Sequence, residues 1–411
     1  MVYIVYAIDY LQLKDGLMFF ASIEQFDQPE LFGHPVAVTN GLQGTCIITR
    51  SYEARYWGIK TGMRLKEAKK LCPGIIQRPS RPKRYAEIST NIMHALTAIT
   101  PDIEVYSVDE AFLELTHCQK IIKSPEVIAN KIQNLVSEIS GLSCSIGISG
   151  DKTTAKYAAK QNKPHGITII HPEKSAETLS DAPVTDLCGI AKGIERFLNA
   201  HGVYKCGDMK NIPISVLGKH FGHPGRRIWL MAQGKDPERI KTDIAEPKSI
   251  GHGKVMPPNT KSIKIILMYL QHMSEKVGSR LRKHHLQSDC FYIGIKCKKG
   301  WIGDRMKCPY PTDDGKSIMK LGRQMILERW TGEGINQIQV TAVRPKALGQ
   351  QIDFLEDTNQ NTHAREKNRV MDLINNRYGD LTIAPSNLIK RSSMPDVIAP
   401  AWKPTGHRRT V

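Results

Sequence analysis

The sequence predicts a multidomain α/β protein, and three observations lead to this fold class. Its 411 residues exceed what one hydrophobic core usually holds. Strand-like and helix-like patterns alternate along the first half, which is typical of mixed α/β organisation. A later segment, 249–344, has 17 Lys and Arg against 7 Asp and Glu, so it alone carries +10 of the net charge of +18. This charge predicts an anionic polymer or surface as the partner.

In the first half, alternating apolar residues predict strands, and apolar repeats at helical spacing predict helices. The expected extended segments are 3–9, 11–15, 46–49, 103–106, 111–115 and 143–148. The expected helices are 19–23, 65–71 and 127–139. The polar Ser107, Asp109 and Glu110 separate two of the strands, which predicts a hairpin-like bend between them.

The second half begins with a helical stretch, 183–235, that glycines interrupt. Residues 246–248 resemble a linker into a compact module, for which we expect a helix at 263–281 and strands at 290–297 and 335–343. Farther on, apolar residues at helical spacing predict a helix over 364–379. The chain should therefore hold a separate basic module followed by a tail.

The composition disfavours two classes of protein, membrane-spanning proteins and secreted proteins with disulfide bonds. No apolar run approaches the roughly 20 residues that span a bilayer, and the N-terminus lacks a leader pattern, so we expect a cytoplasmic protein without a membrane partner. The nine cysteines are scattered singly, without a C-x-x-C pair, which predicts reduced, mostly structural thiols.

The adjacent carboxylates of Asp109 and Glu110 are the strongest chemical signal. Nucleotidyl transfer can use two divalent ions about 3.5–4 Å apart, and such hard ions prefer carboxylate oxygens. Neighbouring side chains of a regular strand face opposite ways, so the pair can serve one site only where the strand bends. Taken alone, the pair fits a solvated surface turn better than a metal site.

Four longer motifs, which follow one another in order along the chain, resemble those of the Y-family DNA polymerases of the DinB/UmuC type. Residues 15–22 are similar to the first catalytic motif, an Asp followed by two aromatics, and residues 106–112 are similar to the second. Residues 49–63 are similar to the fingers motif, and residues 145–166 to the motif that closes the palm. The resemblance extends to about residue 345.

The resemblance implies a right-hand polymerase of translesion type, which adds deoxynucleotides to a primer past damaged template bases. Asp15, Asp109 and Glu110 would be the catalytic residues and would hold two Mg²⁺ ions. The implied domains are a palm (1–24 and 84–172), fingers (25–83), a helix-hairpin-helix thumb (173–243), a linker (244–248), a little finger (249–345) and a clamp- and partner-binding tail (346–411). The implied substrates are primer-template DNA and deoxynucleoside triphosphates.

The resemblance also implies binding residues. Tyr52, Arg55 and Lys163 would grip the incoming triphosphate, and Phe20 would act as a steric gate against ribose, with plain core packing as its alternative. Gly189 and Gly193 would offer backbone N–H groups to a DNA phosphate, although Ala191 replaces a usual glycine between them. Two further lysines are left out of the site as members of a solvated helix face, Lys152 and Lys156.

The tail contains a match to the short clamp-binding peptide of bacterial polymerases. Its residues are Gln351, Ile352, Phe354 and Leu355, and they predict a sliding clamp as partner. The helical segment that follows is more typical of UmuC than of DinB, so a UmuD-like accessory protein is a second expected partner. Such a segment could equally dock on the polymerase itself.

The first metal ligand has two competing positions. The spacing to Phe19 favours Asp15, whereas the better strand ends in Asp9, and choosing Asp9 requires a six-residue insertion before Gly16. This departure motivates an alternative function, a catalytically lapsed or partner-dependent homologue that binds primer-template DNA. A basic DNA-binding regulator would require all these matches to be accidental, and the sequence lacks a helix-turn-helix signature.

Overall fold

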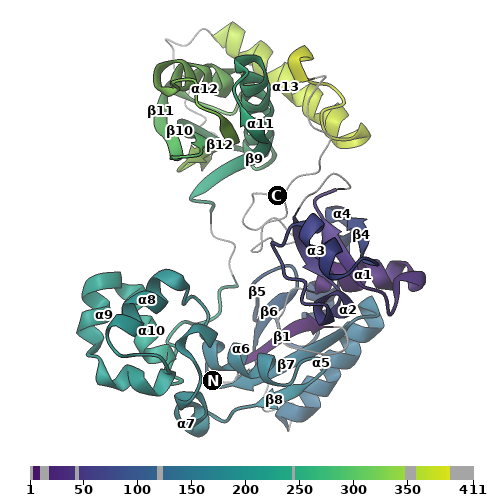
Figure 1. Cartoon of the computed structure of the whole chain (residues 1–411), viewed down its shortest axis with the longest axis vertical. Helices are drawn as coiled ribbons and strands as arrows, with labels where there is room; N and C mark the ends of the chain where they lie inside the picture. Colours follow the sequence, from purple (N-terminus) through teal and green to yellow (C-terminus); the bar gives the residue numbers. More distant parts are fainter. Residues whose placement is uncertain are drawn as a thin grey trace. The chain divides into compact units, whose positions relative to one another are not determined.

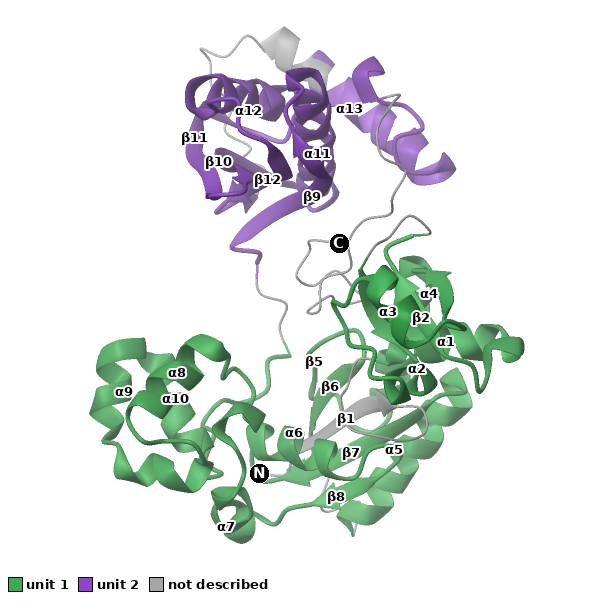
Figure 2. Ribbon diagram, viewed as in Figure 1, with its two compact units in different colours: residues 1–244, 394–405 green, residues 245–393, 406–411 purple. Residues whose placement is uncertain are grey.

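The structure is a computed structural model that describes residues 3–9, 18–41, 46–117, 124–242, 246–347 and 358–388, with the backbone alone at 3–9, 358–362 and 364. The described residues up to 242 form one compact unit, and those from 246 onward form a second (Figure 2). No helix in these ranges is long and apolar enough to cross a membrane.

The first unit is built around a five-stranded sheet, in the order β5 (Ile103–Val105), β6 (Glu110–Glu114), β1 (Tyr3–Asp9), β7 (Ser143–Ser149) and β8 (Ile167–Ile169). Strand β1 is central and pairs antiparallel with both β6 and β7. Alternation along β6 turns Ala111 and Leu113 toward one face and Phe112 toward the other. The two faces therefore have separate cores.

Helices cover both faces of this sheet (Figure 1). On one face, α1 (Phe19–Asp27), α4 (Pro82–Leu96) and α5 (Pro125–Ser140) enclose the main core. On the other, Ala155 and Ala159 of α6 (Lys152–Gln161) pack against Phe112. Helix α6 crosses β7 at Gly147, where an added Cβ would lie 2.1 Å from the carbonyl oxygen of Ala155. This glycine sets how closely α6 approaches the sheet.

Two smaller cores complete the first unit. A three-stranded sheet, β3 (Ile47–Arg50), β2 (Val36–Thr39) and β4 (Ile76–Pro79), packs with α2 (Tyr52–Tyr56) and α3 (Leu65–Leu71). A helical group has its own apolar cluster and contains α7 (Ser175–Ser180), α8 (Lys192–Ala200), α9 (Ile214–Phe221) and α10 (His223–Met231).

The second unit is a four-stranded antiparallel sheet in the order β11 (Gly300–Thr312), β10 (Leu286–Cys297), β12 (Ile335–Val343) and β9 (Ser249–Thr260), with β13 (Lys346–Ala347) pairing to β10. Apolar residues of α11 (Ile263–Lys283) and α12 (Gly315–Arg329) join those of the sheet in one core. Helix α13 (Thr358–Tyr378) is attached by a bidentate pair between Arg282 and Asp372, at 2.6 and 2.9 Å. The tail helix thus docks on the chain's own second unit.

Most expected elements are confirmed, with limits that shift by a few residues at the helices. The bend between β5 and β6 is present, and the tail helix begins earlier than its apolar pattern, because 358–363 is polar. Strands β9 and β11 and helices α4 and α12 were not anticipated, whereas α6 is the helix on which Lys152 and Lys156 were expected. The extended segment expected at 11–15 lies outside the described residues.

Candidate active site

The turn between β5 and β6 carries the two predicted carboxylates. Register places Val105 opposite Ala111, and the backbone N–H groups of Tyr106 and Ser107 both donate to the carbonyl of Glu110. The Ser107 hydroxyl donates to Asp109 Oδ1 at 2.5 Å. Ser89 of α4 anchors the turn by donating to the Val108 carbonyl, also at 2.5 Å. The predicted bend therefore exists and is held from the helix behind it.

The electrostatics of the turn favour a bound cation. Burial and the neighbouring Glu110 charge raise the pKa of Asp109 from its ordinary value to about 6, although Ser107 and the charge of Lys163 oppose this shift. The two carboxylates thus repel each other in a partly buried place, and a divalent ion would relieve that repulsion. Because the charge of Lys163 acts on the pKa of Asp109, this predicted triphosphate ligand lies in the neighbourhood of that carboxyl.

Two lysines of α6 contact the same hairpin, one helical turn apart. Lys156 Nζ lies 2.6 Å from Glu110 Oε2, and Lys152 Nζ lies 2.6 Å from Glu104 Oε2. Their side chains are 12 and 5 % exposed. The expectation that Lys152 and Lys156 belong to a solvated helix face is therefore wrong. They point at the sheet because Gly147 and the alanines of α6 turn that face of the helix inward.

Aromatic rings line these two ion pairs. Lys156 Nζ lies 4.1 Å from the ring centre of Tyr106, and Lys152 Nζ lies 4.9 Å from that of Phe112. The two rings meet edge to face, with centroids 5.3 Å apart. Burial alone lowers the pKa of Lys156, but the Glu110 carboxylate raises it above its ordinary value, so the ammonium stays charged. In the sequence, only the spacing of four residues between Lys152 and Lys156 indicates that the two lysines lie on one face of a helix.

The two positions proposed for the first metal ligand differ in what the structure describes. Asp15 and Gly16 lie outside the described residues. The backbone of Asp9 ends β1, opposite Ser143, and Ala7 of the same strand pairs with Glu110. Because Asp9 follows Ala7 by two residues, the C-terminal end of the central strand β1 lies at the same end of the sheet as the turn that carries Asp109.

The described residues contain no group of three or more His, Cys, Asp or Glu side chains that could hold a metal ion. Asp109 and Glu110 supply two carboxylates, and both positions considered for a third lie where no side chain is described. The two present are of the type that Mg²⁺ binds, and they are adjacent carboxylates on one turn, whose mutual repulsion a cation would reduce. The donor set therefore fits Mg²⁺.

Phe20, the predicted steric gate, lies in the main core and is 6 % exposed. Its ring stacks on Tyr85 of α4, with centroids 4.4 Å apart and an angle of 18°. Glu24, one turn later in α1, is fully buried and accepts hydrogen bonds from the Tyr85 hydroxyl at 2.7 Å and from Arg81 at 2.8 Å. This network fixes the helix that carries Phe20, and the gate assignment stays a prediction.

The remaining predicted nucleotide ligands come from two places. Tyr52 and Arg55 lie on α2, which Ser51 caps by accepting a hydrogen bond from the Ala54 N–H. Lys163 follows α6 and precedes a cis proline. Gly166 is required there, since an added Cβ would lie 1.8 Å from the Asn162 carbonyl oxygen. The tight return of the chain after α6 is thus built by this glycine.

The predicted phosphate contact in the helical group lies at the start of α8. Gly189 has φ +92°, a backbone conformation that favours glycine, and Gly193 is the second residue of α8. An added Cβ at either position would meet nothing within 4 Å. Ala191 is the N-cap of α8, and the first N–H groups of a helix lack partners within it. The site is open to a ligand from outside.

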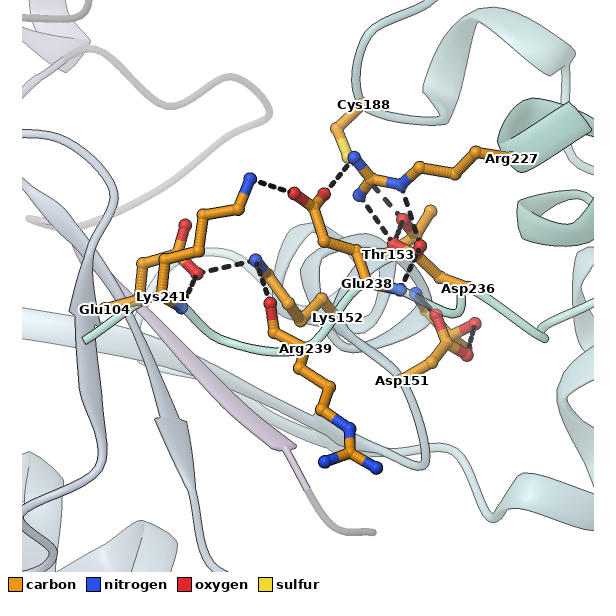
Figure 3. A network of polar contacts seen from close by, with 11 residues as sticks. Glu104, Asp151, Lys152, Thr153, Cys188, Arg227, Asp236, Glu238, Arg239 and Lys241 are labelled. Atoms are coloured by element: carbon orange, nitrogen blue, oxygen red, sulfur yellow. Dashed lines mark hydrogen bonds and ion pairs between the residues drawn. The ribbon is translucent and has the colours of Figure 1, made fainter. Parts of the chain in front are cut away.

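A polar network joins the helical group to the central sheet (Figure 3). Asp236, whose side chain is fully buried, receives a bidentate pair from Arg227 and a hydrogen bond from the Thr153 hydroxyl of α6 at 2.6 Å. Glu238 pairs with Arg227 and Lys241, and the Lys241 N–H donates to Glu104 at 2.8 Å. Residues 236–241 are therefore bound to the same end of α6 that holds Lys152.

The second unit exposes one face of its sheet. Register aligns Gly253, Gln339, Gly294 and Gly303 in a row across four strands, on the face opposite the core. The neighbouring row contains Tyr292 and the exposed Arg305. The Tyr292 side chain lies over Gly294 and Gly303 of the glycine row. The Arg305 guanidinium on this face suits a phosphate.

The predicted clamp peptide lies outside the described residues, so the structure does not place Gln351, Ile352, Phe354 or Leu355. The eight described cysteines are all free thiols.

Comparison with known proteins finds matches along most of the chain. Residues 15–160 match the impB/mucB/samB family, and residues 247–354 match the C-terminal domain of that family. DNA polymerase IV of Moorella thermoacetica is 30% identical over 380 residues, which cover 90% of this chain and 94% of the relative. DNA polymerase IV of Clostridium kluyveri is 31% identical over 392 residues, with 92 and 98% covered.

Solved structures show the same similarity in three dimensions. A Y-family DNA polymerase chimera, Dbh-Dpo4(243-245)-Dbh, superimposes with a TM-score of 0.72 at 26% identity, covering 84% of this chain and all of the other. A Dbh ternary complex superimposes with a TM-score of 0.57 at 26% identity and the same coverage. The two units are thus those of a known architecture.

Proposed function

This chain belongs to the impB/mucB/samB family, the Y-family DNA polymerases of DinB type, and is a translesion DNA polymerase. We propose that the β5–β6 turn is its catalytic centre. The observation that carries the proposal is the pair Asp109 and Glu110, held at a bend, charged, and with Lys163 nearby. The enzyme would extend a primer opposite a template, past damaged bases.

Asp109, Glu110 and one further Asp would hold two Mg²⁺ ions, which supply charge neutralisation at the transferred phosphoryl group. Lys163, Tyr52 and Arg55 would bind the triphosphate oxygens through ammonium, hydroxyl and guanidinium donors. In the reaction, the primer 3′-hydroxyl attacks the α-phosphate and pyrophosphate leaves. Phe20 would exclude a ribose 2′-hydroxyl by contact.

The further Asp is either Asp15 or Asp9, and separate observations support each. Spacing to Phe19 supports Asp15. The backbone register of β1 supports Asp9, because its pairing with β6 runs to the residue beside Asp109. Primer extension by Asp9→Asn and Asp15→Asn separates them: the true ligand loses extension at least 100-fold, while the other variant retains it. Retention in both would overturn a three-carboxylate site.

Several parts of the molecule would bind DNA. The exposed sheet face of the second unit and the net charge of +10 on residues 249–344 support a little finger that contacts the duplex backbone, with affinity that falls as salt rises. The N–H groups near Gly189 and Gly193 would contact one further phosphate. The separate apolar cores support palm, fingers, thumb and little finger as distinct domains, with the limits that the sequence predicts.

The partners beyond DNA and nucleotides follow from the tail. The peptide at 351–355 supports a sliding clamp as partner, and a UmuD-like protein is the second candidate. Helix α13 is already attached to the second unit through Asp372, so an accessory protein would meet its outer side. Because the substrate is DNA, we expect the enzyme in the cytoplasm.

The test of the proposed function is primer extension on undamaged and lesion-containing templates with Mg²⁺ and all four deoxynucleotides. Wild type should extend both, and Asp109→Asn should lose extension while its affinity for primer-template DNA stays within about twofold. Extension that survives in Asp109→Asn would remove the turn as the catalytic centre. DNA binding without extension by wild type would revive the lapsed homologue, which the relatives' names do not favour.

A further inference from the structure

Lys156 contacts a predicted metal ligand from behind, and nothing in the motif resemblance gives it a role. Its ammonium lies 2.6 Å from Glu110 Oε2 and 4.1 Å from the centre of the Tyr106 ring. The Lys156 side chain is 12 % exposed and the Glu110 side chain 23 %, so the pair is largely but not fully shielded from water. These contacts hold the ammonium between the helix, the ring and the carboxylate.

The position of this ammonium is fixed by the fold. Helix α6 approaches β7 so closely that Gly147 leaves no space for a side chain, and Ala155 and Ala159 pack on Phe112. One turn earlier, Lys152 forms the matching pair with Glu104, which also accepts from the Lys241 N–H. The N-terminal half of α6 is therefore attached to the β5–β6 hairpin at two points, which fixes the backbone from which the Lys156 side chain reaches Glu110.

A carboxylate has two oxygens, and an ammonium held at one of them restricts the rotation of the whole group. Glu110 is bound through Oε2, so Oε1 can serve a cation. Partners of this kind, which hold a metal-ligating carboxylate from behind, typically change metal affinity or activity by 10–100-fold when they are removed. A lysine that acted only through its positive charge would repel the metal ion, so its removal would strengthen cation binding.

We propose that Lys156 is a positioning residue of the polymerase reaction, which holds Glu110 by one oxygen so that the other is aimed at the metal ion. The inference rests on the proposed function, because it takes Glu110 as a metal ligand. Lys152 supplies the matched comparison, since it has the same chemistry on the same helix but pairs with Glu104, which is not a predicted ligand.

The experiment is a titration of the full-length protein with Mn²⁺ alone, followed by the electron paramagnetic resonance signal of the free ion. Lys156→Met should bind Mn²⁺ about 10–100-fold more weakly than wild type, Lys156→Arg should recover part of the loss, and Lys152→Met should bind as wild type does. Lys156→Gln, which keeps a donor without the charge, serves if the Met variant fails to fold. Unchanged or tighter binding by the Lys156 variants, or an equal loss in Lys152→Met, would overturn the proposal.

Two further measurements separate this inference from the proposed function. The Mg²⁺ concentration that gives half-maximal primer extension should rise for Lys156→Met by the same factor, with the KM for DNA unchanged. Asp109→Asn should lose Mn²⁺ binding whatever Lys156 does. If Asp109→Asn binds Mn²⁺ normally, the metal site of the proposed function fails; if only the Lys156 variants do, the positioning role alone fails.

Discussion

Replacing Asp109 by Asn should stabilise the metal-free protein while it abolishes primer extension. In the folded state burial and Glu110 raise the pKa of this carboxyl to about 6, against an ordinary value of 3.8. A raised carboxyl pKa means that the stability from the protonated form is full below pH 3.8 and is lost as the pH rises through 6. At neutral pH the charged form therefore opposes folding, and Asn removes that charge.

The magnitude follows from the shift. About two pKa units correspond to roughly 3 kcal/mol at pH 8, and roughly half of that remains at pH 5. Solvent reaches part of the side chain, so these values are upper limits. Asn keeps an oxygen that can accept from Ser107, so little else changes. For a unit of this size, about 3 kcal/mol raises Tm by roughly 6 to 12 °C.

The assay is scanning calorimetry in EDTA at pH 8 and pH 5, with Asp102→Asn, at the far end of the same hairpin, as the baseline for losing one carboxylate. The gain of Asp109→Asn should shrink at pH 5, and it should shrink again at pH 8 in excess Mg²⁺, which stabilises only the wild type. An Asp109→Asn protein that melts at or below the wild-type temperature at pH 8 in EDTA would refute the reasoning.

Three other changes test separate parts of the molecule. Phe20→Ala should admit ribonucleotides in primer extension and should cost about 3–5 kcal/mol in urea unfolding, because the ring is buried on Tyr85; a stability loss without any change in sugar selection would leave Phe20 as core alone. Arg227→Met should cost about 3–5 kcal/mol at pH 7 by leaving the buried Asp236 unpaired. Burial alone would raise the pKa of Asp236, but Arg227 and Thr153 hold it below its ordinary value. The ion pair therefore stabilises the fold above pH 3.8, and the stability difference between wild type and Arg227→Met should vanish as the pH falls through the lowered pKa. A stability difference that persists unchanged in acid would contradict this. Deleting 351–355 should weaken binding to a sliding clamp at least tenfold in a pull-down or biosensor measurement without changing synthesis on a short primer, and clamp binding that survives would exclude the peptide.

Much of the fold could be predicted from local patterns of apolar and polar residues. The bend between β5 and β6 follows from polar residues at 107–110 between two alternating runs, and the sheet confirms it. Strand β11 (Gly300–Thr312) was not anticipated because glycines, prolines and charged residues interrupt its apolar residues, although Ile302, Met306 and Cys308 alternate toward the core. Its pairing with β10 supplies the stability that its own sequence does not signal.

Some residues of the candidate site could be predicted from the sequence, and others could be found only in the structure. The sequence alone determined the carboxylate pair, the family and the basic second unit, because each is written in residue type and spacing along one stretch of chain. The roles of Lys152 and Lys156 were missed, because residue spacing shows that two lysines share a helix face but not what that face meets. Only the tertiary structure decided that it meets Glu104 and Glu110, since Gly147 lets α6 lie against the sheet. Charges from distant parts of the chain become partners only when packing brings them together.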